Sequence, residues 1–471
     1  MKMKEETRQF DAYKRLINFA ARIILIIVQM FMFSHIWYGF YARDMEGVLL
    51  FWRRGNWTVI AIYTLILFFF TQNFGGYKIG YQRISDMALS HILAIVCSNI
   101  VGYLEVTLII RMEKGYANPT PILGLTVVEV LVTFAWIYVT RVIFVRMFPP
   151  RRLLVIYDQR SPESIISKIN ARPDKYRITD SINVSEGHEA VYAKVDTYEA
   201  VVLCDIRSSI RNDILKYCFE NEIRTYITPK LSDIIISGSE GIYLFDTPLY
   251  LSRNHGLTMD QRMVKRTFDV VISLLLLVVL SPFYLLTALC IYAYDRGPVF
   301  YYQERLTRDG RLFKMIKFRS MTTDSEKSGA RLATQKDSRI TPVGRFIRRI
   351  HFDEMPQMIN VLKGDMSFVG PRPERPEIAA VYKEKIPEFD YRLRVKAGLT
   401  GYAQVYGKYN TTPYDKLKLD MTYIENYSFF LDIKIILGTM KVIFQKENTE
   451  GFDESKAVPD HRVDEVKREP W

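Results

Sequence analysis

The first candidate catalytic residues are two adjacent carboxylates, Asp353 and Glu354, in the segment HFDEMPQMIN, residues 351–360. The preceding stretch, residues 301–350, contains 13 lysines and arginines against 5 acids, in a chain with a net charge of +12. A carboxylate pair beside such a stretch indicates one of two arrangements. Either it belongs to a solvated face of ion pairs, or arginines there hold an anionic substrate for attack by a carboxylate.

Basic and amide side chains on both sides of the pair are candidates for binding that anion. Arg372 and Arg375 lie between prolines in GPRPERP, a stiff loop suited to presenting guanidinium groups, which bind phosphate oxygens in a bidentate manner. The segment 297–321 supplies four more candidates: Gln303, Arg305, Lys317 and Arg319. A solvated basic surface is the competing interpretation, although the alternating apolar residues favour side chains that are held in place.

The local pattern around the pair predicts a broken helix over residues 341–364. Pro356 disfavours helix immediately before it but is tolerated in a first turn, and Gly364 supplies a C-terminal stop. Asp353 would then lie at a helix N-terminus, where unpaired N–H groups and the helix dipole attract phosphate. Helix capping by Asp353 is the simpler alternative.

Composition limits the class of protein in which such a site operates. At 471 residues the chain is long enough for two or three domains, and 49% hydrophobic residues fit a membrane protein with a soluble part. A pI near 9.2 indicates an anionic partner such as nucleic acid, acidic lipid or a phosphorylated substrate. The four cysteines form no CxxC pair, which argues against a zinc site and a disulfide scaffold.

Four apolar segments are long enough to cross a membrane as helices, which need about 20 residues each. They are residues 23–42, 55–77, 87–110 and 122–148. Basic residues flank the first segment on its N-terminal side and the fourth on its C-terminal side, so we expect both flanks in the cytoplasm and no cleaved signal peptide. Glu105 and Glu129 interrupt the last two segments, and we expect them to pair inside the bundle or to lie near an interface.

A fifth uncharged stretch, residues 270–294, is interrupted in its middle by Ser281 and Pro282. Its flanks are basic on both sides, so a full crossing would place one basic cluster outside. A helix that bends at Pro282 and returns to the same face keeps both clusters inside, and we therefore predict a re-entrant hairpin. The amphipathic, basic segment 423–444 is suited either to the bilayer surface or to ordinary core packing.

Residues 151–258 have soluble character and alternate predicted helices with predicted strands at 152–158, 199–205 and 224–228. This alternation predicts a small parallel sheet of Rossmann type. The first strand is followed by QRSPES without a GxGxxG, so we expect a structural or regulatory domain without a nucleotide site of the usual kind.

Four motifs occur in a fixed order along the C-terminal half: KRTFDVVISLLLLVVLSPFYLL, GPVFYYQERLTRDGRLFKMIKFRSM, DEMPQMINVLKGDMSFVGPRPERP and AGLTGYAQVYGK. Together they resemble the catalytic domain of bacterial polyprenyl-phosphate sugar-1-phosphate transferases, the monotopic phosphoglycosyl transferases, and the rest of the chain resembles the large members of that family. The resemblance implies a membrane protein of α plus α/β class with four parts. These are a four-helix transmembrane domain (1–150), a Rossmann-like domain without a glycine loop (151–258), a re-entrant helix leading into a mostly helical monotopic catalytic domain (259–450), and a polar tail (451–471).

The resemblance also implies a reaction. The family's nucleophilic carboxylate aligns with Asp353, which would attack the sugar-linked phosphorus of a UDP-sugar and expel UMP. Undecaprenyl phosphate would then accept the phosphosugar from the aspartyl intermediate. Glu354 aligns with the second carboxylate, which would either help Asp353 to hold Mg²⁺ together with the diphosphate or act as a base. Arg372 would bind phosphate, and Ser281 and Pro282 match the family's helix break.

The expected setting is the bacterial cytoplasmic (inner) membrane, with the catalytic domain on the cytoplasmic face, where the product would start exopolysaccharide, capsule or O-antigen synthesis. The expected partners are the lipid bilayer, a UDP-sugar and undecaprenyl phosphate, with a homodimer and polysaccharide-assembly regulators as further candidates and no nucleic acid. Two alternatives are a non-catalytic membrane scaffold or regulator of polysaccharide assembly, and a nucleotide-sugar dehydratase or epimerase. Tyr414 and Lys418 have the spacing of the latter class, but no glycine loop precedes them.

Overall fold

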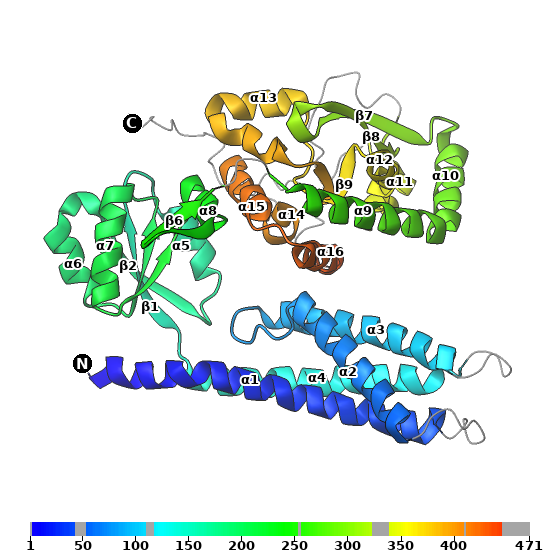
Figure 1. Cartoon of the computed structure of the whole chain (residues 1–471), viewed down its shortest axis with the longest axis horizontal. Coiled ribbons are helices and arrows are strands. Elements are labelled where there is room, and N and C mark those ends of the chain that lie inside the picture. The colour runs from blue at the N-terminus through cyan, green and yellow to red at the C-terminus, as the bar shows by residue number, and fades with distance from the viewer. Residues whose placement is uncertain are drawn as a thin grey trace. The chain divides into compact units, whose positions relative to one another are not determined.

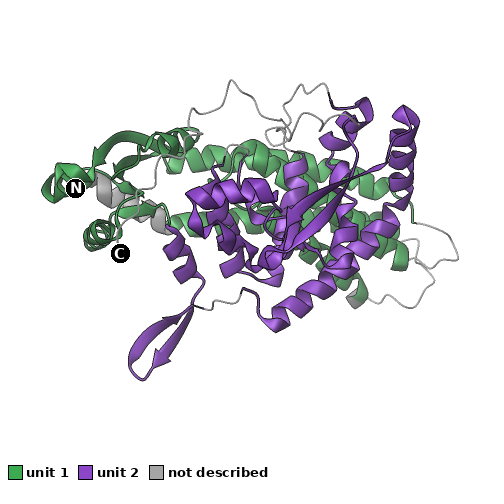
Figure 2. Ribbon diagram, turned by 90° about the horizontal axis from the view of Figure 1, so that it is seen from above, with its two compact units in different colours: residues 1–229 green, residues 230–471 purple. Residues whose placement is uncertain are grey.

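The computed structural model of the protein, shown in Figure 1, describes residues 2–42, 53–109, 117–252, 256–322, 339–408 and 411–444. The chain divides into two compact units, Met1–Pro229 and Lys230–Trp471, which Figure 2 colours separately. The predicted polar tail, residues 451–471, lies outside the described residues.

The first part of unit 1 consists of apolar helices. They are α1 (Lys2–Ile36), which continues as a π-helix (Trp37–Tyr41), α2 (Arg53–Phe74), α3 (Ile84–Ile109) and α4 (Thr120–Met147). Among the described residues, four helices are long and apolar enough to cross a membrane, which confirms the four predicted apolar segments. α1 packs against α2 and α4, and α3 packs against the same two helices, so they form one bundle.

A polar network joins three helices of this bundle. The hydroxyl oxygen of Tyr63 on α2 lies 2.6 Å from Oδ1 of Asn99 on α3 and 2.9 Å from Oε1 of Glu129 on α4. Nδ2 of Asn99 donates to Oε2 of Glu129 at 2.9 Å. Glu129 is fully buried, in agreement with the prediction that it pairs inside the bundle.

Replacing Glu129 measures how much this network stabilises the bundle. The amide of Glu129→Gln both donates and accepts, so we expect it to preserve the contacts with Tyr63 and Asn99. Glu129→Leu removes one hydrogen bond from each partner and leaves Tyr63 and Asn99 with only their remaining contacts, so it is expected to lower the free energy of unfolding by about 1–2 kcal/mol. Thermal unfolding of detergent-solubilised protein compares the two variants. Equal melting temperatures would show that hydrogen bonding at Glu129 does not stabilise the bundle.

The second part of unit 1 is a parallel sheet with the strand order β2–β1–β3–β4. Its elements are β1 (Arg151–Tyr157), α5 (Glu163–Asn170), β2 (Tyr176–Asn183), α6 (His188–Val195), β3 (Ala200–Cys204), α7 (Ser208–Glu220) and β4 (Arg224–Ile227). Leu153 and Val155 of β1 pack with α5, whereas Leu154 and Ile156 pack with α6 and α7. The predicted parallel sheet is present, and its wider likeness to a Rossmann fold stays a prediction. The sequence did not predict β2, because this outer strand has a single buried residue and no apolar run.

Unit 2 is mainly helical, with two-stranded sheets between its helices. The helices are α8 (Leu231–Ser237), α9 (Met259–Val279), α10 (Ser281–Asp295), α11 (Pro342–Arg349), α12 (Gln357–Lys363), α13 (Pro376–Lys385), α14 (Tyr402–Tyr406), α15 (Pro413–Glu425) and α16 (Phe429–Ile443). The strand pairs are β5 (Glu240–Leu244) with β6 (Thr247–Leu251), β7 (Phe300–Leu306) with β8 (Leu312–Phe318), and β9 (Met366–Val369) with β10 (Ala397–Thr400). Leu231, Ile234 and Leu257 pack into the main core with residues of β9, α15 and α16. The predicted domain bounds stay predictions.

Helices α9 and α10 meet at Leu280, whose backbone is not helical, and the two helices form a bend of 62°. The bend adjoins Ser281 and Pro282, where the sequence predicted a break. Oγ of Ser281 donates to the carbonyl oxygen of Val278 at 2.8 Å, so this hydroxyl satisfies one backbone acceptor beside the bend.

The polar face of α9 points inward. Lys265, Asp269 and Ser273, spaced four residues apart, are buried. Nζ of Lys265 donates to Oδ2 of Asp432 on α16 at 2.5 Å, and Oδ1 of Asp269 accepts from the N–H of Phe368 on β9 at 2.9 Å. Exposed large apolar residues occupy other positions of the helix: Val264, Val271, Leu274, Leu275, Val278 and Val279. Such an inverted amphipathic helix indicates apolar surroundings for its outer face.

Candidate active site

The two adjacent carboxylates lie in a short connection between α11 and α12. His351 has a positive φ of 55°, and a single 3-10 turn, Phe352–Glu354, carries the pair. α12 follows Pro356 and ends at Gly364, whose φ is 89°, so the predicted break and C-terminal stop are both present. The N-cap of α12 has no side-chain hydrogen bond, so capping of this helix does not account for Asp353.

Glu354 is held by two cations. Its Oε1 accepts hydrogen bonds from Nζ of Lys317 on β8 at 2.7 Å and from Nη2 of Arg372 at 2.8 Å. Burial favours the neutral acid, but the charges of Arg372 and Lys317 outweigh it and hold the pKa of the Glu354 carboxyl well below its usual range. Glu354 is therefore an anion that orients both cations.

Asp353 has different surroundings. It is only 9% exposed, and its carboxylate makes no hydrogen bond or ion pair with any residue that the structure describes. Burial, together with the adjacent charge of Glu354, raises the pKa of the Asp353 carboxyl. A partly desolvated carboxylate outside an ion pair is the better nucleophile, so the geometry distinguishes the two acids.

The loop between β9 and α13 presents Arg372, and hydrogen bonds from two other arginines to its backbone hold this loop in place. Nη1 of Arg305 on β7 donates to the carbonyl oxygen of Pro373 at 3.0 Å, and Nη2 of Arg392 donates to that of Arg372 at 2.9 Å. Oε1 of Gln303 accepts from Nη2 of Arg305 at 2.5 Å and fixes the orientation of this guanidinium. Lys317 and Arg372 therefore contact the carboxylate pair directly through Glu354, whereas Gln303 and Arg305 support the loop that carries Arg372.

Arg305, Arg372 and Arg375 form a cluster of like charge. The pKa of Arg305 is lowered to about 10, first by burial and then by the charges of Arg372 and Arg375. An anion placed among these guanidinium groups relieves their repulsion. The cluster is thus suited to phosphate oxygens, which guanidinium groups bind in a bidentate manner.

Arg319 lies in different surroundings from the other predicted residues. It is 7% exposed and pairs with Asp295 at the end of α10. Gly297 leaves space for its guanidinium, because a Cβ there would lie 2.0 Å from Nη1 of Arg319. Within the described residues no hydrogen bond or ion pair joins Arg319 to the carboxylate pair, so a role in phosphate binding stays a prediction.

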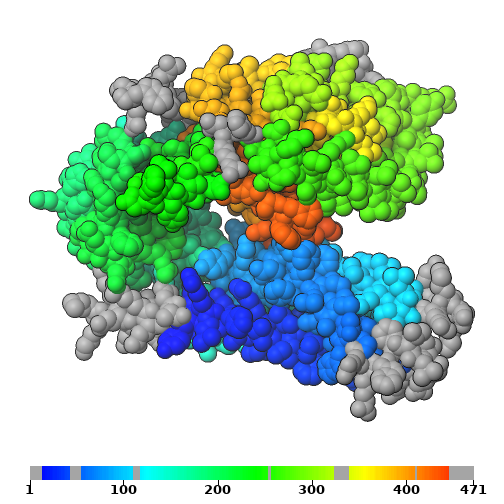
Figure 3. Space-filling view, viewed as in Figure 1, coloured from blue at the N-terminus to red at the C-terminus, as the bar shows by residue number. Residues whose placement is uncertain are grey.

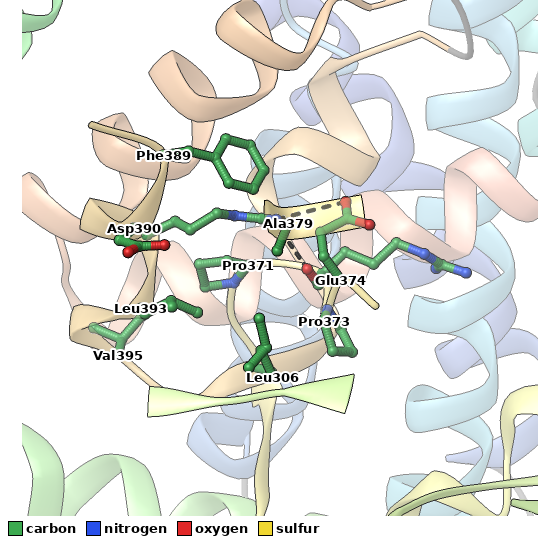
Figure 4. Close-up of a pocket in the computed structure, with 12 residues that line it drawn as sticks. Leu306, Pro371, Pro373, Glu374, Ala379, Phe389, Asp390, Leu393 and Val395 are labelled. Carbon is green, nitrogen blue, oxygen red and sulfur yellow. Dashed lines mark hydrogen bonds and ion pairs between the residues drawn. The ribbon is translucent and has the colours of Figure 1, made fainter. Parts of the chain in front are cut away.

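The buried ion pair Arg392–Asp420 is a part of the site that the sequence did not predict. Nε and Nη2 of Arg392 lie 2.9 and 2.7 Å from Oδ2 of Asp420, and both residues are buried. Arg392 also lines a small pocket together with Pro371, Pro373 and Glu374, and Figure 4 shows this pocket. Asp420 is 28 residues from Arg392 in the chain, so no local pattern links the two.

Breaking this pair is expected to loosen the Arg372 loop. Arg392→Met leaves Asp420 buried without its partner and should lower the free energy of unfolding by about 3–5 kcal/mol. The double variant Arg392→Met/Asp420→Leu removes both charges and should recover most of that loss. Thermal unfolding of the single and double variants measures the difference, and a double variant as unstable as the single one would contradict the ion-pair explanation.

Metal binding by the pair would need additional ligands. Among the described residues no group of three or more histidine, cysteine, aspartate or glutamate side chains is arranged to hold a metal ion. Mg²⁺ is commonly held by one or two carboxylates, with water and phosphate oxygens completing its octahedral shell. Asp353 and Glu354 therefore fit this ion only together with a phosphate-bearing ligand.

Comparison with known proteins finds its matches in the part of the chain that contains the carboxylate pair. Residues 260–446 match the model of the family described as bacterial sugar transferase. An exopolysaccharide production protein of Rhizobium leguminosarum bv. phaseoli is 38% identical over 198 residues, which are 40% of this chain and 98% of that relative.

Two larger relatives are matched over part of their length. A UDP-N-acetylgalactosamine-undecaprenyl-phosphate N-acetylgalactosaminephosphotransferase of Aeromonas hydrophila is 40% identical over 183 residues, or 38% of this chain and 43% of the relative. An undecaprenyl-phosphate glucose phosphotransferase of Komagataeibacter xylinus is 32% identical over 311 residues, or 62% of this chain and 58% of the relative. The matched part of this chain thus spans about half the length of these two proteins.

Proposed function

Because the chain belongs to the bacterial sugar transferase family, we propose that it transfers a sugar 1-phosphate from a UDP-sugar to undecaprenyl phosphate. The observation that carries the proposal is the asymmetry of the carboxylate pair. Glu354 is neutralised by Lys317 and Arg372, whereas the buried Asp353 beside it has no such partner among the described residues. Relatives named for N-acetylgalactosamine and for glucose point to a UDP-hexose as donor.

In the first step, a carboxylate oxygen of Asp353 attacks the phosphorus that carries the sugar. A bond between this oxygen and phosphorus forms, the bond to the bridging oxygen breaks, and UMP leaves with the electron pair. In the second step, a phosphate oxygen of undecaprenyl phosphate attacks the same phosphorus and releases Asp353. The bond between the sugar and its own phosphate oxygen is not broken, and the product is undecaprenyl-diphosphate sugar.

The basic residues of the site would act by binding and by charge compensation. Arg372 and Arg305 would hold the diphosphate, with Arg375 adding to the positive field and Gln303 orienting Arg305. Lys317 lies close enough to Glu354 to compensate its charge while the substrate anion approaches. Mg²⁺, held by Asp353 and Glu354 together with the diphosphate, would supply charge neutralisation to the leaving group.

The membrane arrangement belongs to the same proposal. Helices α9 and α10 would enter and leave the bilayer from the cytoplasmic side, since the apolar face of α9 is exposed and its polar face is buried. The orange-red C-terminal segment that includes α16 reaches the surface in Figure 3, and Phe430 and Phe444 on it are exposed. We place the protein in the bacterial inner membrane, where donor from the cytoplasm meets the lipid acceptor.

The test is UMP release from a panel of UDP-sugars by detergent-purified protein with undecaprenyl phosphate and Mg²⁺. A two-step mechanism also predicts exchange of labelled UMP into the UDP-sugar in the absence of acceptor, because the first step is reversible. Release selective for one sugar identifies the donor. Silence with every UDP-sugar and every other nucleotide sugar would overturn the proposal and favour a non-catalytic membrane scaffold.

The pH dependence of UMP release follows from the charges around Asp353. Its raised pKa means that the nucleophile is protonated, and activity lost, at a higher pH than for an ordinary aspartate. Lys317 lowers this pKa, so Lys317→Gln is expected to move the acid limb of the kcat/KM profile to still higher pH. Profiles of both proteins measured between about pH 4 and 9 test the sign. A shift to lower pH would contradict the assignment of this limb to Asp353.

A further inference from the structure

A second cluster of cations, the Lys396 cluster, consists of Arg266, Arg308, Arg311 and Lys396. It lies at the C-terminal end of α12, where Nη1 and Nη2 of Arg266 donate to the carbonyl oxygens of Val361 and Leu362 at 2.6 and 2.7 Å. The carboxylate pair precedes the other end of this seven-residue helix, which at 1.5 Å per residue is about 10 Å long. The cluster is therefore separate from the cations that contact Glu354.

Lys396 and Arg266 face the same space beside Gly364. A Cβ on Gly364 would lie 3.6 Å from Nζ of Lys396 and 3.7 Å from Nη2 of Arg266. Gly364 has a φ of 89°, in the region that favours glycine, so no side chain fills this space. An anion at that point would lie within reach of both charges, where opposite charges attract strongly.

Two arginines at the turn between β7 and β8 add to this positive charge. Nε of Arg308 pairs with Oδ2 of Asp309 at 3.0 Å, and Asp309 is exposed. Nη2 of Arg311, which is also exposed, pairs with Oδ1 of Asp365 at 2.9 Å. Water screens exposed ion pairs and leaves them weak, so these two arginines remain able to attract a further anion.

Lys396 is the cation of the cluster that lacks a partner in the part of the chain that the structure describes. Its half-buried ammonium makes no hydrogen bond or ion pair there. Burial lowers the pKa of this ammonium, and the charges of Arg266, Arg308 and Arg311 lower it further. Asp269 acts in the opposite direction, but it already accepts hydrogen bonds from β9. A bound anion would supply the missing counter-charge.

The place of Arg266 on α9 indicates which anion is available to the cluster. The uncharged run 270–294 begins four residues after Arg266, and α9 exposes Val271, Leu274 and Leu275 within that run. Basic side chains at the end of an apolar helix lie at the level of the lipid headgroups. The phosphate of a phospholipid is the anion found at that level.

We propose that the Lys396 cluster binds the headgroup phosphate of an anionic phospholipid of the bilayer. The phosphate pairs with the ammonium of Lys396 and reduces the repulsion among the three guanidinium groups. The bound lipid thereby holds the C-terminal end of α12 at the membrane surface. The inference rests on the membrane placement of α9 proposed above and does not depend on the transfer reaction.

Native mass spectrometry of protein released from nanodiscs measures the bound lipid. With phosphatidylglycerol and phosphatidylcholine in equal amounts, wild-type protein should retain phosphatidylglycerol, and Lys396→Gln should lower its occupancy about fivefold, the effect of one cation at an anionic surface. Lys396→Arg keeps the charge and should retain the lipid. Lys416→Gln on α15 is the matched control, because Lys416 is also half-buried, and it should match the wild type. Equal occupancy in Lys396→Gln and wild-type protein would overturn the proposal.

Competition distinguishes a bilayer phospholipid from other sources of phosphate. Inorganic phosphate and undecaprenyl phosphate are added separately to the same nanodiscs before release. The phosphatidylglycerol signal that depends on Lys396 should survive both additions. Displacement by inorganic phosphate would identify a site for soluble anions, and displacement by undecaprenyl phosphate would identify a site for the lipid acceptor. Either result would refute binding of a bilayer phospholipid.

Two further measurements separate failure of this proposal from failure of the earlier ones. Lys396→Gln should keep the wild-type kcat for UMP release in detergent, and a large loss would place Lys396 in the reaction instead. Leu274→Cys in nanodiscs should resist a water-soluble maleimide, as mapped by peptide mass spectrometry. Labelling at position 274 would refute the membrane placement of α9 and the lipid site with it. Protection there, without selective lipid retention, would refute the lipid site alone.

Discussion

Replacement of Asp353 by asparagine is expected to lower the rate of UMP release by at least about 1,000-fold, the scale on which enzymes lose activity with their nucleophile. Asparagine has nearly the same size but offers no anionic oxygen for attack on phosphorus. The ion pairs of Glu354 with Lys317 and Arg372 do not involve Asp353, so the variant should keep the geometry of the site. The loss should therefore appear in the chemistry and leave folding intact.

Intact-protein mass spectrometry separates this explanation from loss of binding. Wild-type protein incubated with the donor but no acceptor should gain the mass of the sugar phosphate, and Asp353→Asn should not. Asp309→Asn is the matched control, because Asp309 is exposed and pairs only with the neighbouring Arg308 in the contacts that are described. An adduct on the Asp353→Asn protein, mapped to Glu354, would exchange the roles of the two carboxylates.

Arg372→Met is expected to lower kcat/KM about 100- to 1,000-fold, the range observed when one preorganised donor is removed from an active site. The change removes a guanidinium from the phosphate-binding cluster and the largest single charge that keeps Glu354 ionised. The pKa of Glu354 should rise as a result. Arg372→Lys restores the charge but not the planar fork, so we expect an intermediate loss of about tenfold or more.

The control for Arg372 is Arg160→Lys, since Arg160 is an ion-paired arginine of similar exposure, 52% against 49%. It should leave UMP release unchanged. Steady-state kinetics with the preferred UDP-sugar measures all three variants. If Arg372→Lys matched the wild type, the bidentate contact would be excluded and Arg372 would act only as a point charge.

The sequence alone predicted the features that depend on local pattern. Long uncharged runs predicted four apolar helices, because crossing a bilayer requires length and composition and not a particular partner. Ser281 and Pro282 predicted the break between α9 and α10, since proline restricts the backbone wherever it stands. The order of the motifs also indicated the family and the carboxylate pair that carries the proposed chemistry.

The tertiary structure decided how the residues of the site differ from one another. Lys317 and Arg372 lie 37 and 18 positions from Glu354 in the chain, and both donate hydrogen bonds to it. Neither donates a hydrogen bond to Asp353 in the contacts that the structure describes, although the two acids are neighbours in the chain. In the sequence Arg319 cannot be told apart from the other candidate arginines, but in the structure it pairs with Asp295. Arg392 pairs with Asp420, which lies 28 positions away in the chain. Charge interactions depend on distances and burial that only the packed chain fixes, so a sequence pattern can supply the candidate residues but not their partners.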